Sequence, residues 1–409
     1  MKRSLWAFLP VCLLANCSLL HLREESKLLD ASGTVVVNVS APAADREKTS
    51  VLAYLRKNGG APVMAGHQTL GEDGLALLML RPQHRYGIVA FTDRNENRSL
   101  DTGEPAAWQE NIAPVPLNQT PEKPQFVDLT LTPWKPRPGQ SDRIALPAED
   151  SSLGGVLGAA LGEVASLDEP RFTTEVGSSG LWQPQETLEK HGFGIYFIQP
   201  YDPQRIPVLF VNGIGGSPQD WRYFIEHLDQ RKYQAWFYVY PSGLRLDKSA
   251  NALGKAIDIL HRRYNPPQLH VVAHSMGGLV ARAAIQRGNS PVSKFVSIST
   301  PWGGHKAAEG GLRHLRHPLP SWKDMVPGST YQQGLFTRPV PAEFYLIYGE
   351  KTKNAPWLSE ANDGTVDVGS ELDPHAVKEA RAVVRFPLDH EAILQSPDTL
   401  RQVEKFLAK

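Results

Sequence analysis

The chain has 409 residues, and its 43 Lys and Arg balance 43 Asp and Glu, so the formal net charge is zero. This length is typical of two or three domains, of which at least one can bury a full-sized core. Without a basic surplus or a dense run of Lys and Arg, nothing in the composition suits a phosphate backbone, and no nucleic-acid partner is expected.

The first residues have the pattern of an export signal. A short basic start is followed by an apolar stretch from Leu5 to Leu14. This stretch is too short to span a bilayer but suits the core of a secretory signal peptide. Both cysteines of the chain, Cys12 and Cys17, lie in this leader. With Cys17 as its only cysteine, a mature protein has no internal disulfide.

The leader ends in Leu14-Ala15-Asn16-Cys17, which resembles the lipobox of bacterial lipoproteins. Asn16 departs from the motif, because Gly or Ala is usual there. The resemblance implies a signal peptide over residues 1–16, a lipid anchor on Cys17, and export to the bacterial cell envelope. Ser18 resembles the second residue of outer-membrane lipoproteins, which face the periplasm or the cell surface. An ordinary signal peptide with two incidental cysteines is the alternative.

Residues 34–133 are predicted to form a small all-β sandwich, after a linker over residues 17–33. Short β-branched or alternating runs are separated by Gly, Pro, Asn and Asp. These runs are GTVVVNVSAP, TSVLAYLRKN, GLALLMLRP, YGIVAFTD and QFVDLTLTP. The pattern resembles the transthyretin-like modules appended to many exported bacterial proteins. Recognition of a partner and spacing from the membrane remain open as roles of this module.

One loop of this module has an acidic pattern. From Asp93 to Glu104, the sequence DRNENRSLDTGE matches an EF-hand loop at positions 1, 3, 5, 9 and 12. Arg98 stands where glycine is usual, and a strand rather than a helix precedes the loop. A solvated turn rich in Asn and Asp is therefore favoured over a calcium site, and no metal is predicted.

The second half of the chain predicts an α/β fold. A Pro-rich break, LTPWKPRPGQSD, indicates a stiff linker, and residues 134–170 are assigned as a connecting segment. Over residues 171–409, strand-like runs alternate with helical stretches such as PQDWRYFIEHLDQ and SANALGKAIDILHRRY. This alternation predicts a mostly parallel sheet with helices on both faces. The strand-like runs are GIYFIQPYDP, IPVLFVNGI, YQAWFYVYPSG, QLHVVAHS, KFVSISTP, EFYLIYGE and ARAVVRFPL.

Ser275 lies in VVAHSMGGLVAR, where a buried strand gives way to a helix. A nucleophile elbow is such a strand-to-helix turn, and it lifts a serine hydroxyl above the edge of the sheet. The turn leaves no room for large side chains two residues to either side, and Ala273 and Gly277 occupy those places. The N-terminus of the following helix favours negative charge near the serine. Ser275 is therefore the predicted nucleophile.

Acyl transfer also needs two backbone N–H donors aimed at the forming oxyanion. One is expected from Met276, directly after the serine. The other is expected from Ile214, in the glycine-rich loop that follows the strand IPVLFVNGI. Lipases and esterases usually begin this loop with His-Gly, whereas this chain has Asn212-Gly213, a change expected to alter how the loop is braced.

An acid and a histidine follow in the chain order of the same fold. Asp363 precedes Gly364 in a turn after the strand EFYLIYGE, and His390 follows ARAVVRFPL. His390 is predicted to take the serine proton, while Asp363 orients the ring and stabilises the imidazolium. Asp367 and Asp389 compete with Asp363. Asp363 is preferred because Asp-Gly-x-Val resembles this site in lipase-like proteins, and because Asp389 adjoins the histidine in sequence.

Together these motifs resemble the α/β-hydrolase superfamily, nearest to its lipase-like and inositol-deacylase-like members. The resemblance covers about Phe193–Phe406 and rests on PVLFVNGIGG, VVAHSMGGLVAR, ISTPWGGH, NDGTV and DHEAIL. It implies a serine hydrolase that cleaves a small-molecule or lipid ester through an acyl-enzyme, with no metal and no organic cofactor. An acyltransferase or thioesterase with the same triad, and a catalytically inactive binding lipoprotein, are the alternatives.

The segment over residues 301–336 is longer than an ordinary connection, which is typical of a cap over an active site. Trp302 and Leu312 are candidates for lining an acyl pocket, with a surface loop carrying packed aromatic residues as the alternative. His305, His314 and His317 lack the spacing of a metal site and are expected to be solvated.

Overall fold

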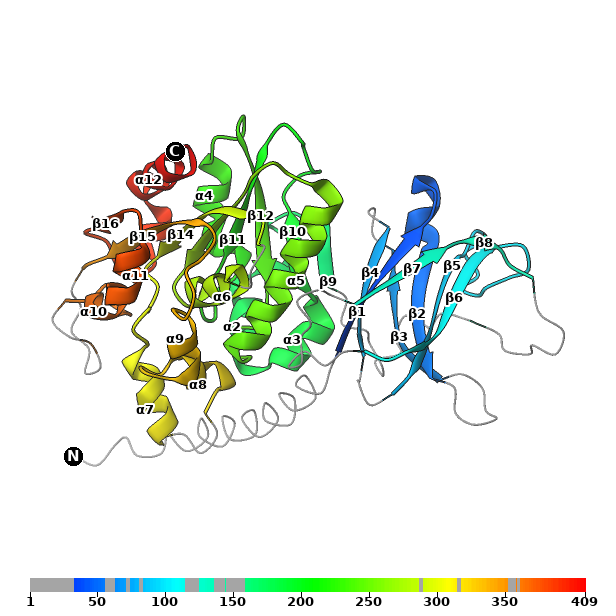
Figure 1. The fold of residues 1–409 in the computed structure, drawn as a ribbon, viewed down its shortest axis with the longest axis horizontal. Coiled ribbons are helices and arrows are strands. Elements are labelled where there is room, and N and C mark those ends of the chain that lie inside the picture. The colour runs from blue at the N-terminus through cyan, green and yellow to red at the C-terminus, as the bar shows by residue number, and fades with distance from the viewer. Residues whose placement is uncertain are drawn as a thin grey trace, which may run out of the picture. The chain divides into compact units, whose positions relative to one another are not determined.

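A computed structural model gives the fold of the chain. It describes residues 33–55, 63–70, 74–80, 84–114, 125–135, 144, 159–286, 290–314, 318–351, 358 and 361–409. The chain divides into two compact units, one that ends at Glu163 and one that begins at Val164 (Figure 1). The predicted signal peptide and Cys17 lie outside the described residues. Within the described part, no helix is long and apolar enough to cross a membrane.

The first unit is built from two β-sheets. A three-stranded sheet has the order β4-β1-β7, in which β1 is antiparallel to β4 and parallel to β7. An antiparallel five-stranded sheet has the order β3-β2-β5-β6-β8. The strands are β1 (Gly33–Ser40), β2 (Thr49–Leu55), β3 (Val63–Thr69), β4 (Leu75–Leu80), β5 (Tyr86–Thr92), β6 (Pro105–Ile112), β7 (Gln125–Thr130) and β8 (Thr132–Pro133), with the 3-10 helix η1 (Ala43–Lys48) before β2.

Strand β2 shows why this unit needs apolar packing on both faces of its sheet. Val51 and Ala53 point into one buried cluster, while Leu52 and Tyr54 point into a second cluster on the opposite side. Successive side chains of a strand face opposite ways, so a strand that is apolar at every position needs cover on both faces. The predicted all-β module has this architecture, although β3 and β6 were not among the predicted runs because polar residues interrupt them.

The loop from Asp93 to Glu104 is closed by its own backbone donors. The Asp93 carboxylate accepts the N–H of Arg98 at 2.7 Å, and Glu104 accepts the N–H groups of Arg94 and Asp101 at 2.7 and 2.9 Å. Arg98 adopts a left-handed conformation with φ 62°. No group of three His, Cys, Asp or Glu suited to a metal occurs among the described residues. These hydrogen bonds form a turn rich in Asn and Asp, although Asp93 and Glu104 at its two ends are buried rather than solvated.

An eight-stranded sheet has the order β16-β15-β14-β13-β11-β12-β10-β9, and all of it except Ala159–Glu163 of β9 lies in the second unit. The five pairings from β12 through β11, β13, β14 and β15 to β16 are parallel, and β10 is antiparallel to β12. The strands are β9 (Ala159–Val164), β10 (Phe193–Phe197), β11 (Ile206–Val211), β12 (Tyr233–Val239), β13 (Leu269–His274), β14 (Val292–Ile298), β15 (Glu343–Gly349) and β16 (Val383–Phe386).

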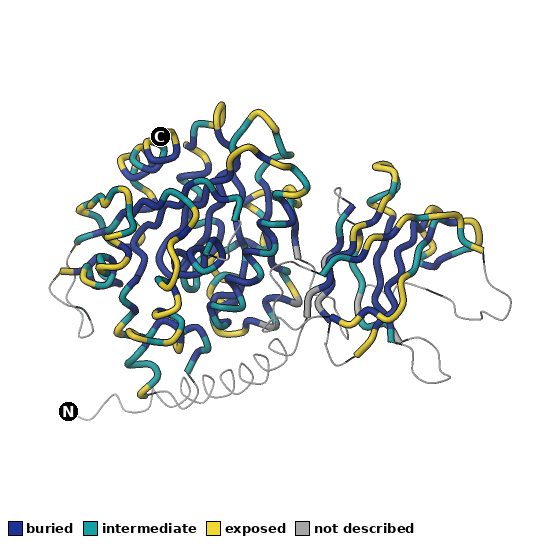
Figure 2. Tube along the Cα trace, in the orientation of Figure 1, coloured by how far each residue is buried: buried dark blue, intermediate teal, exposed yellow. Residues whose placement is uncertain are grey.

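The central strands of this sheet are buried along nearly their whole length, because helices cover both of its faces (Figure 2). The longest helix, α5, buries Leu246, Ala250, Leu253, Ile257 and Leu260 at helical spacing. The helices are α2 (Thr174–Trp182), α3 (Pro184–His191), α4 (Arg222–His227), α5 (Leu246–Tyr264), α6 (Met276–Ile285), α7 (Lys306–His314), α8 (Pro320–Met325), α9 (Thr330–Gly334), α10 (Val368–Glu371), α11 (Pro374–Glu379) and α12 (Pro397–Leu407), with 3-10 helices η2 (Pro170–Phe172), η3 (Pro218–Trp221) and η4 (Ala392–Gln395).

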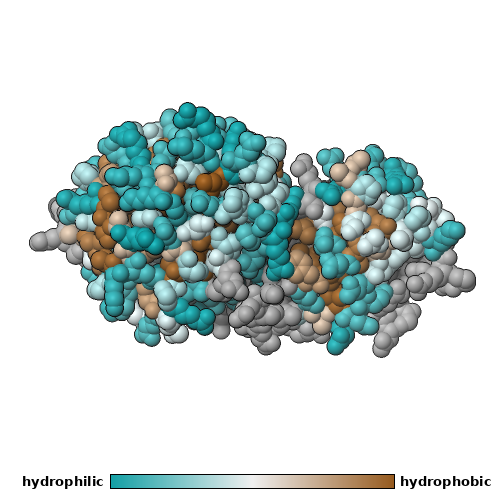
Figure 3. Space-filling view, turned by 45° about the horizontal axis from the view of Figure 1, so that its top comes forward, coloured by the Kyte–Doolittle hydropathy of each residue, from teal (hydrophilic) through white to brown (hydrophobic). Residues whose placement is uncertain are grey.

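One expectation about this half of the chain needs correction. The segment 134–170 was assigned as a connection, yet it contains β9, and the boundary between the two units falls inside it. The sequence GGVLGAALGEVASL gave no clear signal because its glycines mask any alternation. Elsewhere the predicted strands agree with the observed sheet. The face seen in Figure 3 is mostly hydrophilic, with smaller hydrophobic areas between the teal ones.

Candidate active site

Ser275 occupies a strained turn between β13 and α6. Its backbone has φ 53° and ψ −132°, and its N–H donates to the carbonyl of Ile298 on β14 at 2.8 Å. A non-glycine residue in this region costs about 1–3 kcal/mol and persists only where the surroundings enforce it. A Cβ on Gly277 would lie 2.4 Å from the carbonyl of Asn212, and one on Gly278 would lie 2.0 Å from the Thr300 hydroxyl. The close approach of the Asn212 backbone to Gly277, and of the Thr300 side chain to Gly278, therefore requires both glycines.

The loop after β11 lies directly against the serine. A Cβ on Gly213 would fall 2.9 Å from Ser275 Cβ, so the loop reaches the serine through its backbone. The N–H of Gly215 donates to the Ser242 hydroxyl at 2.8 Å. Among the described residues, no partner is recorded for the N–H groups of Ile214 or Met276. Both predicted oxyanion donors are therefore free of internal hydrogen bonds.

Asn212 braces this loop from within. Its side-chain amide donates to the carbonyl of Gly216 at 2.8 Å and to that of Gly213 at 3.3 Å. The Tyr240 hydroxyl donates to the Asn212 carbonyl at 2.8 Å. The Asn212 side chain donates both of these bonds from one nitrogen, which carries two protons, whereas each nitrogen of a histidine ring, the residue usual here in lipases, carries at most one. Asn212 therefore holds the loop by a different set of hydrogen bonds.

Replacing Asn212 with Ala is expected to lower kcat by about 10²-fold with little change in KM. The change leaves the Gly216 carbonyl without its donor, whereas the Gly213 carbonyl keeps the N–H of Gly216 at 3.2 Å. It thereby loosens the backbone that carries Ile214, and a displacement of about 1 Å at such a site costs about this much. Ester hydrolysis by purified Asn212→Ala measures the effect. Gln219→Ala is the control, because Gln219 also donates to a backbone carbonyl, that of Leu167, but outside the loop. Equal losses in both variants would argue against a special role for Asn212.

His390 and Asp363 form a buried pair at the same edge of the sheet. His390 Nδ1 lies 2.5 Å from Asp363 Oδ2. The other carboxylate oxygen accepts the N–H groups of Thr365 at 2.9 Å and Val366 at 2.7 Å. Burial raises the pKa of Asp363, but the hydrogen bond and charge of His390, with the two backbone donors, outweigh it and hold the pKa below its usual value. Asp363 is thus an ionised acceptor that leaves Nε2 of His390 for another partner.

The competing acids have other partners. Asp367 pairs with Lys306 at 2.7 Å. Asp389 accepts the N–H of Ala392 at 2.9 Å and lies 3.6 Å from Lys351. Among the hydrogen bonds of the described residues, only that of Asp363 joins an acid to the His390 ring.

Two further histidines lie close to this pair. His274, the residue before the serine, has Nε2 2.9 Å from the backbone carbonyl of His390. Burial, and then the charge of His390, lower the pKa of His274 to about 3, so the neutral ring donates this bond. His305 was expected to be solvated, which is wrong. Its Nδ1 accepts the N–H of Ala307 at 3.1 Å. Burial, and then the charge of His390, lower the pKa of His305, whereas a hydrogen bond to the Thr365 backbone acts in the opposite direction.

The predicted cap segment forms three helices, α7, α8 and α9. Trp302, proposed to line an acyl pocket, is instead a core residue, packed against Phe295, Phe344 and Phe336. Leu312 is partly buried on α7. Of the other two histidines of this segment, the side chain of His314 and all of His317 lie outside the described residues.

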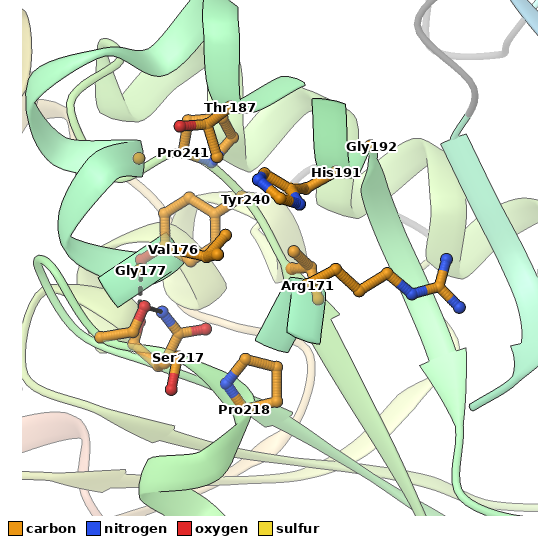
Figure 4. A pocket seen from close by; sticks show the side chains of 14 residues that line it. Arg171, Val176, Gly177, Thr187, His191, Gly192, Ser217, Pro218, Tyr240 and Pro241 are labelled. Carbon is orange, nitrogen blue, oxygen red and sulfur yellow. Dashed lines mark hydrogen bonds between the residues drawn. The ribbon is translucent and has the colours of Figure 1, made fainter. Parts of the chain in front are cut away.

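A small cavity lies beside the loop over residues 212–217, which follows β11 (Figure 4). Its volume is about 20 Å³, which suits one water molecule and no substrate. Thr187, His191 and Tyr240 line it together with Ser217 of the loop. A Cβ on Gly177 of α2 would lie 2.5 Å from the carbonyl of Gly216, so α2 packs tightly on the same loop. A larger hollow of about 460 Å³ includes none of the predicted site residues.

Acid lability is expected from buried histidines of β13. His270 has no exposed surface, and burial lowers its pKa to about 4. Because the folded pKa lies below the unfolded value, this stability is present above pH 6.5 and is lost as pH falls toward 4. Replacing His270 with Leu should reduce the loss of unfolding free energy between pH 7 and pH 5 by about 2 kcal/mol.

Chemical denaturation at the two pH values tests this prediction. Neither ring nitrogen of His270 has a hydrogen bond of normal geometry among the described residues, so leucine leaves no polar group without a partner. Substitution of the exposed His227 by Leu is the control for the loss of an imidazole outside the core. An unchanged slope in His270→Leu would show that other groups cause the acid lability.

Comparisons with known proteins address the fold. Residues 206–334 match the family model described as the alpha/beta hydrolase fold. A search of curated proteins found no match. Among solved structures, the mature lipase BlEst2 of Bacillus licheniformis aligns at 18% identity and a TM-score of 0.44, over 52% of this chain and 97% of that one.

Two further solved structures are similar at a greater distance. A lipase-esterase related protein of Clostridium acetobutylicum aligns at 11% identity and a TM-score of 0.36, over 52% of this chain and 99% of that one. A bacterial membrane phospholipase A aligns at 16% identity and a TM-score of 0.33, over 51% of this chain and 80% of that one. These similarities are too distant to bear on the chemistry of this chain. From its own sheet order and the family model, the chain has an α/β-hydrolase fold preceded by a strand-rich unit.

Proposed function

We propose that this protein is a serine ester hydrolase, with Ser275 as nucleophile, His390 as general base and Asp363 as the acid that orients it. The observation that carries the proposal is the geometry of the strand ends. A strained serine stands at the end of β13, and a buried His390–Asp363 hydrogen bond of 2.5 Å lies in the loops that follow β15 and β16. The carboxyl ends of parallel strands share one edge of a sheet, which is where such folds place their sites.

The proposed reaction has two steps. Ser275 Oγ attacks the ester carbonyl and passes its proton to His390 Nε2, while the N–H groups of Met276 and Ile214 hold the oxyanion. The tetrahedral species collapses, and the leaving alcohol takes the proton from His390. Water then attacks the acyl-enzyme with His390 again as base, which releases the carboxylic acid and restores Ser275.

The substrate proposed is an ester with an apolar acyl chain. Leu181, on α2, lies 3.8 Å from the position of a Cβ on Gly215 of the oxyanion loop. Leu181 and Trp322 pack against the buried Leu319, and the exposed Trp182 meets the Trp322 ring edge-on at 6.3 Å. Apolar side chains next to the loop suit a hydrocarbon chain better than a charged acyl group.

The proposed location is the bacterial cell envelope, with a lipid anchor at Cys17. The leader motif alone supports it. Acyl transfer to another alcohol, thioester cleavage, and binding without turnover are the alternatives. The first two use the same residues, whereas the last does not explain why Ser275 keeps its strained backbone beside the His390–Asp363 pair.

Labelling with a fluorophosphonate probe tests the proposed nucleophile. Protein without its leader is compared with Ser275→Ala and His390→Ala, and with Ser249→Ala as a control in another buried serine, on α5. We expect labelling of wild type and Ser249→Ala and none of the other two. Full labelling or full ester hydrolysis in folded Ser275→Ala would refute the proposal. Turnover of esters from two to twelve carbons, with added alcohols and thioesters, then separates the alternatives.

A further inference from the structure

Glu371, the last residue of α10, is a carboxylic acid with no exposed surface. Within the described part of the chain, neither carboxyl oxygen has a hydrogen bond of normal geometry. The Ser299 hydroxyl and the Gly349 N–H act to lower the pKa of Glu371, but burial outweighs them. The proposed reaction makes no use of this acid, although a buried carboxylate without strong donors is costly. Its protonation state therefore matters for whatever lies beside it.

Glu371 adjoins the acid of the proposed triad. A Cβ on Gly349 would lie 3.1 Å from Asp363 Cβ and 3.3 Å from Ser299 Oγ, so a single glycine backbone separates these groups. Ser299 is itself buried with φ 47°, a second strained serine at the end of a strand. The charged groups that act on Glu371 are both acids, Asp363 and Glu350. Ionisation of Glu371 would place a second negative charge behind Asp363.

The cations near this region are already paired. Among the described residues, no ion pair of Glu371 is recorded, and the neighbouring acids have partners of their own. These pairs are His390 with Asp363 at 2.5 Å, Arg385 with Glu350 at 2.5 Å, Lys306 with Asp367 at 2.7 Å, and Lys351 with Asp389 at 3.6 Å. Burial, followed by the charge of Asp363, raises the pKa of Glu371 well above its usual value.

We propose that Glu371 is a neutral acid, which keeps its proton at working pH and packs uncharged behind Asp363. Asp363 is then the one negative charge that faces His390 directly. Two acids held in one site in opposite protonation states are a recognised way to divide roles between carboxyl groups. The role of Asp363 beside His390 rests on the proposed function. The protonation state of Glu371 is independent of it.

Stability as a function of pH tests the protonation state without any substrate. The folded pKa of Glu371 exceeds its unfolded value, so wild type loses stability relative to an uncharged variant as pH rises above about 4.5. Chemical denaturation from pH 5.5 to 7.5 should show the folding constant of Glu371→Gln gaining on wild type as pH rises, by up to about tenfold per pH unit, or about 1.4 kcal/mol. Glu371→Met should show the same slope, and it serves if Glu371→Gln does not fold.

Glu350→Gln is the matched control, because it removes a partly exposed, ion-paired carboxylate from the same region. The ratio of the folding constant of Glu350→Gln to that of wild type should stay constant over this pH range. The proposal would be overturned if the folding constants of the Glu371 variants kept a constant ratio to wild type, or if that of Glu350→Gln gained on wild type by the same factor.

The pH profile of activity tests the charge state of Glu371 independently of stability. A neutral Glu371 contributes no charge to His390, so the acid limb of kcat/KM in Glu371→Gln should coincide with that of wild type. A shift of this limb to lower pH would mean that Glu371 is ionised, and would overturn the proposal. If wild type hydrolyses no ester, the proposed function fails, and the denaturation slope still decides the state of Glu371.

Discussion

Replacement of Asp363 with Asn is expected to lower kcat about 10⁴-fold while leaving the fold intact, by analogy with the same change in serine proteases. The reason lies in the hydrogen bonds of this side chain. Oδ1 accepts two backbone N–H groups, from Thr365 and Val366, and so must remain a carbonyl oxygen in the variant. The amide NH₂ then faces His390 Nδ1 and donates to it, which moves the ring proton to Nε2. In that tautomer, His390 is unable to accept the serine proton.

Steady-state hydrolysis of a short p-nitrophenyl ester measures this loss, with circular dichroism to check folding. Asp367→Asn and Asp389→Asn are matched controls, because the same change is made in the two acids that competed with Asp363 in the sequence. Both should stay within about tenfold of wild type, since their side chains pair with Lys306 and Lys351. A larger loss in either control than in Asp363→Asn would reassign the acid.

Replacement of Arg282 with Ala is expected to lower the free energy of unfolding by about 3–5 kcal/mol. Arg282 lies on α6, the helix that begins directly after Ser275, and its side chain is fully buried. It donates to Glu379 at 2.6 Å and to the carbonyl of Leu335 at 2.7 Å, and it packs over the Phe336 ring at 4.2 Å. The alanine variant leaves a cavity and removes the cationic partner of Glu379.

Urea denaturation of Arg282→Ala measures the effect, and two further variants show its origin. Arg282→Met with Glu379→Leu should recover part of the loss, because it removes both charges and fills the space. Arg222→Ala breaks an exposed ion pair with Asp168 and should cost under about 1 kcal/mol. A cost for Arg282→Ala as small as that for Arg222→Ala would show that this buried pair does not hold α6 in place.

Much of the fold follows from local pattern. Strands such as β11, β12 and β13 are apolar runs without alternation, and that pattern alone indicates burial on both faces. The prediction of an α/β-hydrolase fold behind a strand-rich module is confirmed. The pattern failed where glycine or polar residues interrupt a strand, as in β3, β6 and β9, because pairing with neighbours, rather than local preference, makes those segments extended.

The sequence by itself determined the order of the candidate residues, since an elbow serine, an acid before glycine and a histidine each follow their own strand. Only the tertiary structure decided which of three aspartates bonds to His390, that Trp302 is core, and that His274, His305 and Glu371 surround the pair. The physical reason is separation along the chain. Elbow and turn chemistry is local and leaves a motif, whereas burial and hydrogen bonding between Asp363, His390 and their neighbours depend on strands that meet only when the sheet forms.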